Sequence, residues 1–283
     1  MSPAVDFGEI MTAWARKTPS VSGLVLIGSR ERANTDTLEY ADAHSDWDFQ
    51  IITSNPKMFA DRAWTRDLAD IELRAYAART AQIGGVPKIN AVFAGAESDL
   101  VIIPAAAARL MKLAVAFGLH RREGRLRCRA QDLAEVIRPG WRFLKGAETW
   151  DPLYRQITAD VPDPRLGNEA ACQLAETFVC DYVWCLRKIA RGELRATQRV
   201  LLQELAEVNL KLLHELKRRK GERTFTKARR IERITTADQL ESVTVIAPLD
   251  ATSLHGAVAK AAATCRQLMG ALVGESWQWP EID

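Results

Sequence analysis

The sequence predicts an α+β protein in which a domain with a small mixed sheet precedes an all-helical bundle domain. Three observations predict this class. Short apolar runs alternate with helical patterns in the first half, amphipathic helical patterns fill nearly all of the second half, and proline-rich punctuation separates the two. The punctuation consists of Pro139-Gly140, Asp151-Pro152 and residues 161–164. We therefore expect domains at residues 1–150 and 151–283.

The first half contains several candidate strands. Residues 21–27 form an apolar run that ends at Gly28-Ser29, and residues 47–53 resume the strand pattern after a polar loop. Residues 57–82 have a helical pattern. The remaining elements expected here are strands at 89–93 and 100–103, a helix from about 105 to 117 and an edge strand at 126–128.

The second half is predicted to be helical because its apolar residues recur every three or four positions. Leu174, Phe178, Tyr182, Cys185 and Ile189 share one helix face. A similar stripe runs through residues 201–216, and Gly221 is a suitable stop for that helix. A last helix is expected over 253–273, with Ser253 as its N-cap.

Composition excludes some classes of protein. Lys and Arg number 39 against 36 Asp and Glu, so the net charge of +3 gives no general attraction to nucleic acid or to an anionic membrane. Charged residues interrupt the most apolar stretches, 104–120 and 253–273, so neither is expected to cross a membrane. The start of the chain lacks a signal pattern and the five cysteines follow no disulfide or zinc spacing, which predicts a cytoplasmic protein.

The strongest chemical signal is Ser45-Asp46-Trp47-Asp48 at the start of the second predicted strand. Side chains alternate along a strand, so Asp46 and Asp48 share one face and Trp47 lies on the other. Two adjacent carboxylates repel each other unless a cation lies between them, and oxygen ligands of this kind suit Mg²⁺. The motif therefore predicts a divalent metal site.

Two further features add to this site. Gly28-Ser29 ends the preceding strand, where glycine allows a close backbone approach and the serine hydroxyl can hold a phosphate oxygen. Asp99 begins a later apolar strand and joins the pair if the strands are neighbours. Three carboxylates beside a phosphate-binding turn predict metal-assisted phosphoryl transfer.

These residues resemble the DNA polymerase β-like nucleotidyltransferase superfamily. The segments Ile27-Gly28-Ser29-Arg30 and Ser45-Asp46-Trp47-Asp48 are most similar to the aminoglycoside nucleotidyltransferases, especially the streptomycin 6-adenylyltransferase branch. The resemblance implies that Asp46 and Asp48 bind Mg²⁺ and that Asp99 completes the metal site or acts as a base. It also implies that Gly28, Ser29 and Arg30 bind ATP, whose AMP would pass to a hydroxyl of a small molecule with release of pyrophosphate.

Three residues of the helical half are further candidates. Asp181 lies at the edge of an apolar stripe, where it would bind the acceptor, act as the general base or pair with a neighbouring arginine. Arg187 and Arg191 belong to a basic cluster that would either contact the triphosphate or form a solvated helix face. The sequence leaves each of these alternatives open.

Other functions remain alternatives. The same chemistry could modify a macromolecule, either a tRNA end or a protein side chain, and the basic runs at 121–129 and 215–230 favour this reading. A full helical domain favours a nucleoside triphosphate and a small hydroxyl-bearing acceptor as the partners. A non-catalytic nucleotide-binding relative is the third alternative. The sequence does not choose between a monomer and a homodimer, or identify the acceptor.

Overall fold

The computed structural model describes residues 6–31, 41–42, 44–69, 71–81, 85–122, 124–163, 165–224 and 228–282. It divides into two compact units, Met1–Pro164 and Arg165–Asp283. The first combines a mixed sheet with helices and the second is helical, so the predicted α+β class is confirmed. The boundary expected at residue 150 falls inside helix α4 (Ala147–Asp160), which belongs to the first unit.

The described strands of the first unit form a six-stranded sheet in the order β3-β4-β5-β2-β1-β6. Strands β2 and β5 run parallel, and the other neighbouring pairs are antiparallel. The strand bounds are β1 (Val21–Ile27), β2 (Trp47–Thr53), β3 (Leu73–Thr80), β4 (Pro87–Phe93), β5 (Ala96–Pro104) and β6 (Trp141–Lys145).

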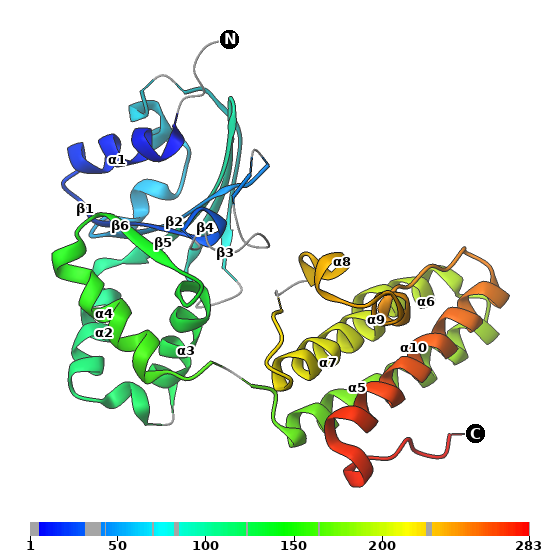
Figure 1. Ribbon diagram of the computed structural model, residues 1–283. Coiled ribbons are helices and arrows are strands. Elements are labelled where there is room, and N and C mark those ends of the chain that lie inside the picture. Colours follow the sequence, from blue (N-terminus) through cyan, green and yellow to red (C-terminus); the bar gives the residue numbers. More distant parts are fainter. Residues whose placement is uncertain are drawn as a thin grey trace. The chain divides into compact units, whose positions relative to one another are not determined.

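Helices cover both faces of this sheet, as Figure 1 shows. Helix α1 (Phe7–Lys17) packs on one face, and α2 (Ala105–Ala116), α3 (Arg125–Ile137) and α4 pack on the other. The alternation in β1 matches this arrangement, because Leu24 and Leu26 belong to the core beneath α1 while Val25 and Ile27 belong to the opposite core. Burial on both faces explains why residues 23–27 of β1 carry no polar side chain.

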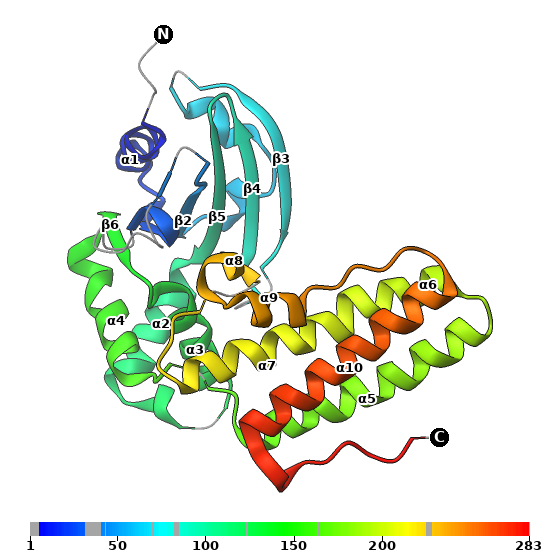
Figure 2. The ribbon, with the colours of Figure 1, turned by 45° about the vertical axis from the view of Figure 1, so that its right-hand side comes forward.

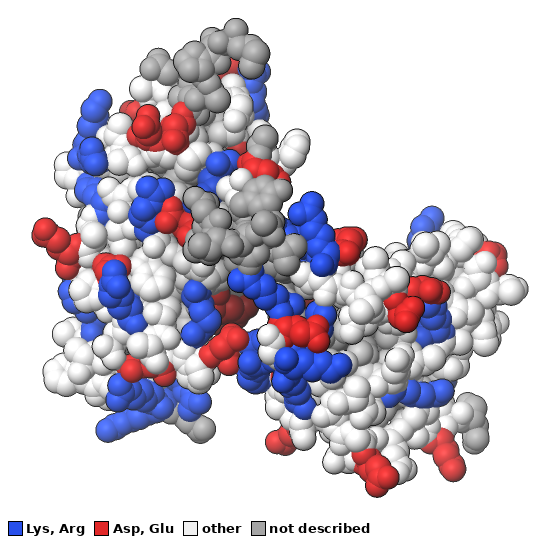
Figure 3. Space-filling model, viewed as in Figure 1, with Lys and Arg blue, Asp and Glu red and all other residues white. Residues whose placement is uncertain are grey.

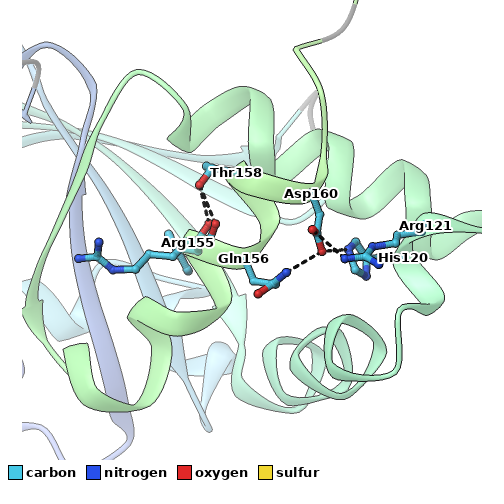
Figure 4. Close-up of polar contacts among 7 residues, drawn as sticks. His120, Arg121, Arg155, Gln156, Thr158 and Asp160 are labelled. Atoms are coloured by element: carbon cyan, nitrogen blue, oxygen red, sulfur yellow. Dashed lines mark hydrogen bonds and ion pairs between the residues drawn. The ribbon is translucent and has the colours of Figure 1, made fainter.

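A polar network joins two elements at one end of the first unit (Figure 4). The buried His120 ring bonds to Asp160 at the end of α4 through Nε2, at 2.8 Å. The Asp160 carboxylate also accepts hydrogen bonds from Gln156 at 2.8 Å and from Arg121 at 2.9 Å. The bond from Gln156 and then those from Arg121 and His120 lower the pKa of Asp160 to about 2.

The second unit is built from long helices. Its helices are α5 (Asn168–Ala190), α6 (Leu194–Val200), a π-helical turn (Leu201–Leu205), α7 (Ala206–Arg219), α8 (Ile231–Ile234), α9 (Ala237–Val243) and α10 (Ala251–Val273). Figure 2 shows α5, α7 and α10 side by side. Their shared core includes Phe178, Cys185, Leu212, Cys265 and Met269. The apolar stripes predicted for residues 174–189 and 201–216 therefore do face inward.

Helix ends agree in part with the sequence. Gly221 has a positive φ of 73° and follows Lys220, the C-cap of α7, so the predicted stop is confirmed. The predicted N-cap of α10 is wrong. Helix α10 begins at Ala251, and its N-cap is Asp250, whose carboxylate accepts the backbone N–H of Ser253.

Two predicted elements in the first unit are wrong. Residues 57–82 do not form a helix. They contain two short 3₁₀ turns, Pro56–Phe59 and Ala63–Asp67, and then β3, because the backbone of β3 pairs with β4 and this tertiary pairing outweighs the helix propensity of an alanine-rich segment. Residues 126–128 lie within α3 and not in a strand. The described sheet has β3 at one edge and β6, which pairs with β1, at the other.

No helix in the described parts of the chain is both long and apolar enough to cross a membrane.

Candidate functional site

The three predicted carboxylates meet at one end of the strand pair β2–β5. Asp48 is directly opposite Asp99 in the parallel register of these strands, and Asp46 lies just before β2. One oxygen of each carboxylate can be chosen so that all three lie within 4.8 Å of one another. Each of the three residues is half-buried. The structure therefore assembles the acidic cluster that the sequence predicted.

Packing on the opposite face of β2 fixes which way these carboxylates point. The Trp47 ring stacks on Phe49 with centroids 5.9 Å apart, and Phe7 of α1 contacts both rings. Asp48 is consequently on the other face, together with the buried Gln50, whose Oε1 accepts a 2.6 Å hydrogen bond from the Tyr154 hydroxyl. A one-residue slip of β2 would turn the carboxylates into the aromatic core beneath α1 and the aromatic rings to the opposite face, so the register is strongly determined.

The Asp48 side chain packs directly against Gly28, where any other residue would have a Cβ. The φ of Gly28 is +77°, and a Cβ built on it would lie 2.2 Å from Oδ2 of Asp48. A side chain at this position would therefore be strained and would displace the carboxylate. The neighbouring Ser29 is buried, and its hydroxyl has no hydrogen-bond partner among the described residues. Gly28 thus lies next to the acidic cluster, and the adjoining Ser29 carries a buried hydroxyl that still needs a hydrogen-bond partner.

Arg30 orders the loop that carries Asp46. Its Nε donates to the carbonyl of Asp46 at 3.0 Å, and its Nη2 donates to the carbonyl of Ser45 at 2.5 Å. The guanidinium also lies over the Trp47 ring, 4.1 Å from the centroid. These contacts tie the end of β1 to the start of β2. Binding of ATP by Arg30 remains a prediction.

Sequence reasoning did not identify two residues on β4 that contact Asp99. The Lys88 ammonium lies 2.5 Å from Oδ2 of Asp99, and the Asn90 amide donates to Oδ1 of the same carboxylate. Asn90 is opposite Asp99 in the β4–β5 register. Both oxygens of Asp99 therefore have a donor, and the other amide atom of Asn90, Oδ1, is buried without a hydrogen-bond partner in the described structure.

The oxygen atoms gathered here are suitable ligands for a divalent cation. Three carboxylates so close together repel one another when ionised, and Lys88 pairs with one of them, Asp99. Ser29 Oγ and Asn90 Oδ1 are oxygens that can interact with further ligands or with water bound to the cation. All these groups are hard oxygen donors, the type that Mg²⁺ prefers. Asp46, Asp48 and Asp99 are accordingly the residues that would hold the ion.

The remaining predicted residues lie in the second unit, on or just after α5. Asp181 is half-buried, and no ion pair or hydrogen bond involves it among the described residues. Burial raises the pKa of Asp181, and the nearby carboxylate of Glu204 raises it further. The alternative in which a neighbouring arginine pairs with Asp181 is therefore not seen. Arg187 and Arg191 are both exposed, and their roles remain predictions.

Both basic runs contain ion pairs that reduce their free charge. Figure 3 shows Lys and Arg side chains gathered at the lower end of the first unit. Within the first run, Arg121 pairs with Asp160 and Arg129 lies 3.7 Å from Asp132. Glu215 pairs with Arg219, and Lys217 pairs with Glu222, within the described part of the second run. These pairs weaken the argument that either run is a nucleic-acid site.

Comparisons with known proteins add little to this geometry. No protein-family model and no curated protein matches the sequence. Among solved structures, an aminoglycoside 6-adenyltransferase from Bacillus subtilis is similar at 11% identity and a TM-score of 0.39, covering 99% of this chain and 94% of that one. A nucleotidyltransferase-like protein from Exiguobacterium sibiricum 255-15 is similar at 11% identity and a TM-score of 0.35, covering 93% and 73%. At these TM-scores the function has to be argued from the residues of this chain.

Proposed function

We propose that this protein is a Mg²⁺-dependent nucleotidyltransferase that moves AMP from ATP to a hydroxyl of a small molecule, with release of pyrophosphate. The observation that carries the proposal is the cluster of Asp46, Asp48 and Asp99, held within 4.8 Å by the register of β2 and β5. Three half-buried carboxylates whose oxygens lie within 4.8 Å of one another repel when ionised, and a divalent cation in addition to Lys88 would offset this repulsion.

In the proposed reaction the acceptor oxygen forms a bond to the α-phosphorus of ATP while the bond from that phosphorus to the bridging oxygen of pyrophosphate breaks. A divalent ion in the cluster would supply electrostatic stabilisation of the charge on the transferring phosphoryl group. Gly28 lets the backbone lie close to Asp48 and to an approaching phosphate oxygen, to which the Ser29 hydroxyl would donate a hydrogen bond. Asp99 accepts the acceptor's proton or completes the ion's ligands.

The acceptor class that we propose to test first is an aminoglycoside-type antibiotic, following the resemblance of residues 27–30 and 45–48. The experiment combines MgATP with streptomycin, other aminoglycosides, lincosamides, tRNA and the protein itself, and measures pyrophosphate release and product mass. Asp48→Asn removes one charge of the cluster with little change in shape. Asp67→Asn, at an exposed position in the same unit, is the matched control.

A nucleotidylated small molecule that forms with the wild type and the control but not with Asp48→Asn supports the proposal. Labelling of tRNA or of the protein alone would transfer the function to a macromolecular acceptor. Binding of MgATP without transfer to any acceptor on the panel would instead support the non-catalytic alternative. Parallel assays of Asp181→Asn, Arg187→Met and Arg191→Met test the roles predicted for the second unit.

A further inference from the structure

Asp99 pairs with a cation on the neighbouring strand β4. Lys88 contacts one of its oxygens at 2.5 Å and Asn90 donates to the other. The side chains of Lys88 and Asp99 are 25% and 19% exposed, so the pair is largely shielded from water. A charge-assisted contact in such surroundings is stronger than one at an open surface. Lys88 therefore competes directly with any metal ion for Asp99.

Lys88 has the freedom to leave this contact. A divalent ion held by the cluster would place two positive charges close to the ammonium and repel it. The ammonium is carried on a flexible four-carbon stem near the start of β4, and the side chain is 25% exposed to solvent. It can move without any change in the backbone. The place to which it moves must offer negative charge, since an unpaired ammonium in a half-buried site is costly.

Asn90 keeps Asp99 in place during such an exchange. Its amide nitrogen contacts Oδ1 of Asp99, whereas Lys88 contacts Oδ2. Cross-strand pairing of Asn90 with Asp99 fixes this geometry independently of Lys88. When Lys88 departs, Oδ2 becomes free as a ligand while the carboxylate keeps its orientation. The two β4 side chains thus have separable roles, one as a counter-ion and the other as a support.

We propose that Lys88 is a displaceable counter-ion: it neutralises Asp99 in the metal-free protein and binds a phosphate oxygen of the nucleotide once a divalent ion occupies the cluster. This inference rests on the proposed function and adds a residue that binds the nucleotide. It implies that the protein resists metal binding in the absence of nucleotide. Metal and nucleotide should then bind cooperatively, because the nucleotide provides the anion that receives Lys88.

The test measures the affinity for Mn²⁺ and the affinity for a nucleotide analogue, which the loss of Lys88 should change in opposite directions. Lys88→Met should bind Mn²⁺ alone about tenfold more tightly than wild type, because no ammonium competes for Asp99, as followed by the electron paramagnetic resonance signal of free Mn²⁺. The same variant should bind α,β-methylene-ATP in saturating Mn²⁺ about tenfold more weakly by calorimetry, because one charged phosphate contact is lost. Lys88→Gln serves as a second variant if the methionine variant folds poorly.

Arg79→Met is the matched control, because Arg79 is an exposed cation that lies opposite Lys88 in the β3–β4 register. It removes the same charge without touching Asp99 and should change both affinities by less than about twofold. Lys88→Arg keeps the charge and should retain most of the nucleotide affinity.

Opposite shifts in Lys88→Met, absent from Arg79→Met, would support the proposal. Shifts of both affinities in one direction, equal shifts in the control, or no shift would overturn it. If the wild type binds Mn²⁺ and the nucleotide analogue, and Asp48→Asn loses the Mn²⁺, the proposed function survives the failure of this inference. If the wild type binds neither, both fail.

Discussion

Replacing Gly28 by alanine should separate the function of the site from the stability of the fold. The φ of +77° places an L-residue in the left-handed region, which costs about 1–2 kcal/mol. For a unit of this size such a cost lowers the Tm by roughly 2–8 °C. The new Cβ would also lie 2.2 Å from Oδ2 of Asp48, a distance that real Cβ contacts do not show. The carboxylate has to move away.

The expected functional loss is much larger than the loss of stability. The new Cβ displaces the Asp48 carboxylate, and a misplacement of about 1 Å at a reacting centre lowers rates by about 10²-fold. Pyrophosphate release from MgATP measures the rate, Mn²⁺ titration measures the metal site, and thermal unfolding measures the stability.

Gly95→Ala is a close control for this experiment. Gly95 has a φ of +86° in the β4–β5 turn, but its Cβ would meet nothing within 4 Å. It should lose similar stability and keep both metal binding and activity. The reasoning is refuted if Gly28→Ala retains the metal affinity and rate of the wild type, or if Gly95→Ala loses them to the same degree.

Three further predictions concern charges elsewhere in the chain. Asp181→Asn should raise the free energy of unfolding at pH 7 by roughly 0.5 kcal/mol, because it removes a half-buried carboxylate and its repulsion from Glu204, and the gain should shrink as the pH falls through the raised pKa of Asp181. Asp160→Asn should lower the Tm at pH 7. The pKa of Asp160 is depressed to about 2 in the folded state, so its contribution to folding stability is complete above about pH 4 and is lost as the pH falls towards 2. The Tm values of the wild type and of Asp160→Asn should therefore converge over this pH range. A constant difference between them would contradict the assignment. Arg30→Met should weaken Mn²⁺ binding about tenfold with little change in Tm, because Arg30 orders the carbonyls of the loop that carries Asp46; unchanged binding would show that the loop is ordered without it.

The local part of the site could be predicted from the sequence because strand alternation is a local property. Asp46 and Asp48 flank an aromatic residue, and the apolar run before Gly28 identifies the adjoining strand. The core helices of the second unit were predicted for the same reason, since Phe178 and Cys185 belong to a clear stripe of apolar residues. The period of the apolar residues was sufficient to predict the type of element wherever one face of that element is buried.

The errors occurred where long-range pairing or burial outweighs local preference. The alanines of β3 favour a helix, but the strand is fixed by hydrogen bonds to β4. Pro152 suggested a linker, yet α4 continues through it because Trp150, Leu153 and Tyr154 are buried around it. In both segments, contacts with residues far away in the sequence determine the structure, and a window of neighbouring residues does not contain that information.

The roles of Lys88 and Asn90 lie between these two cases. Phe93 and Ala96 pair across the two-residue connection Ala94-Gly95, and this tight turn fixes the whole register of β4 against β5. Counting back from such a turn puts Asn90 opposite Asp99, and Lys88 is two residues further on the same face. The signal was therefore present in the sequence. Gly95 marks a hairpin turn between β4 and β5. That turn places Lys88 and Asn90 beside Asp99, so the local sequence of the turn determines which side chains border the metal site.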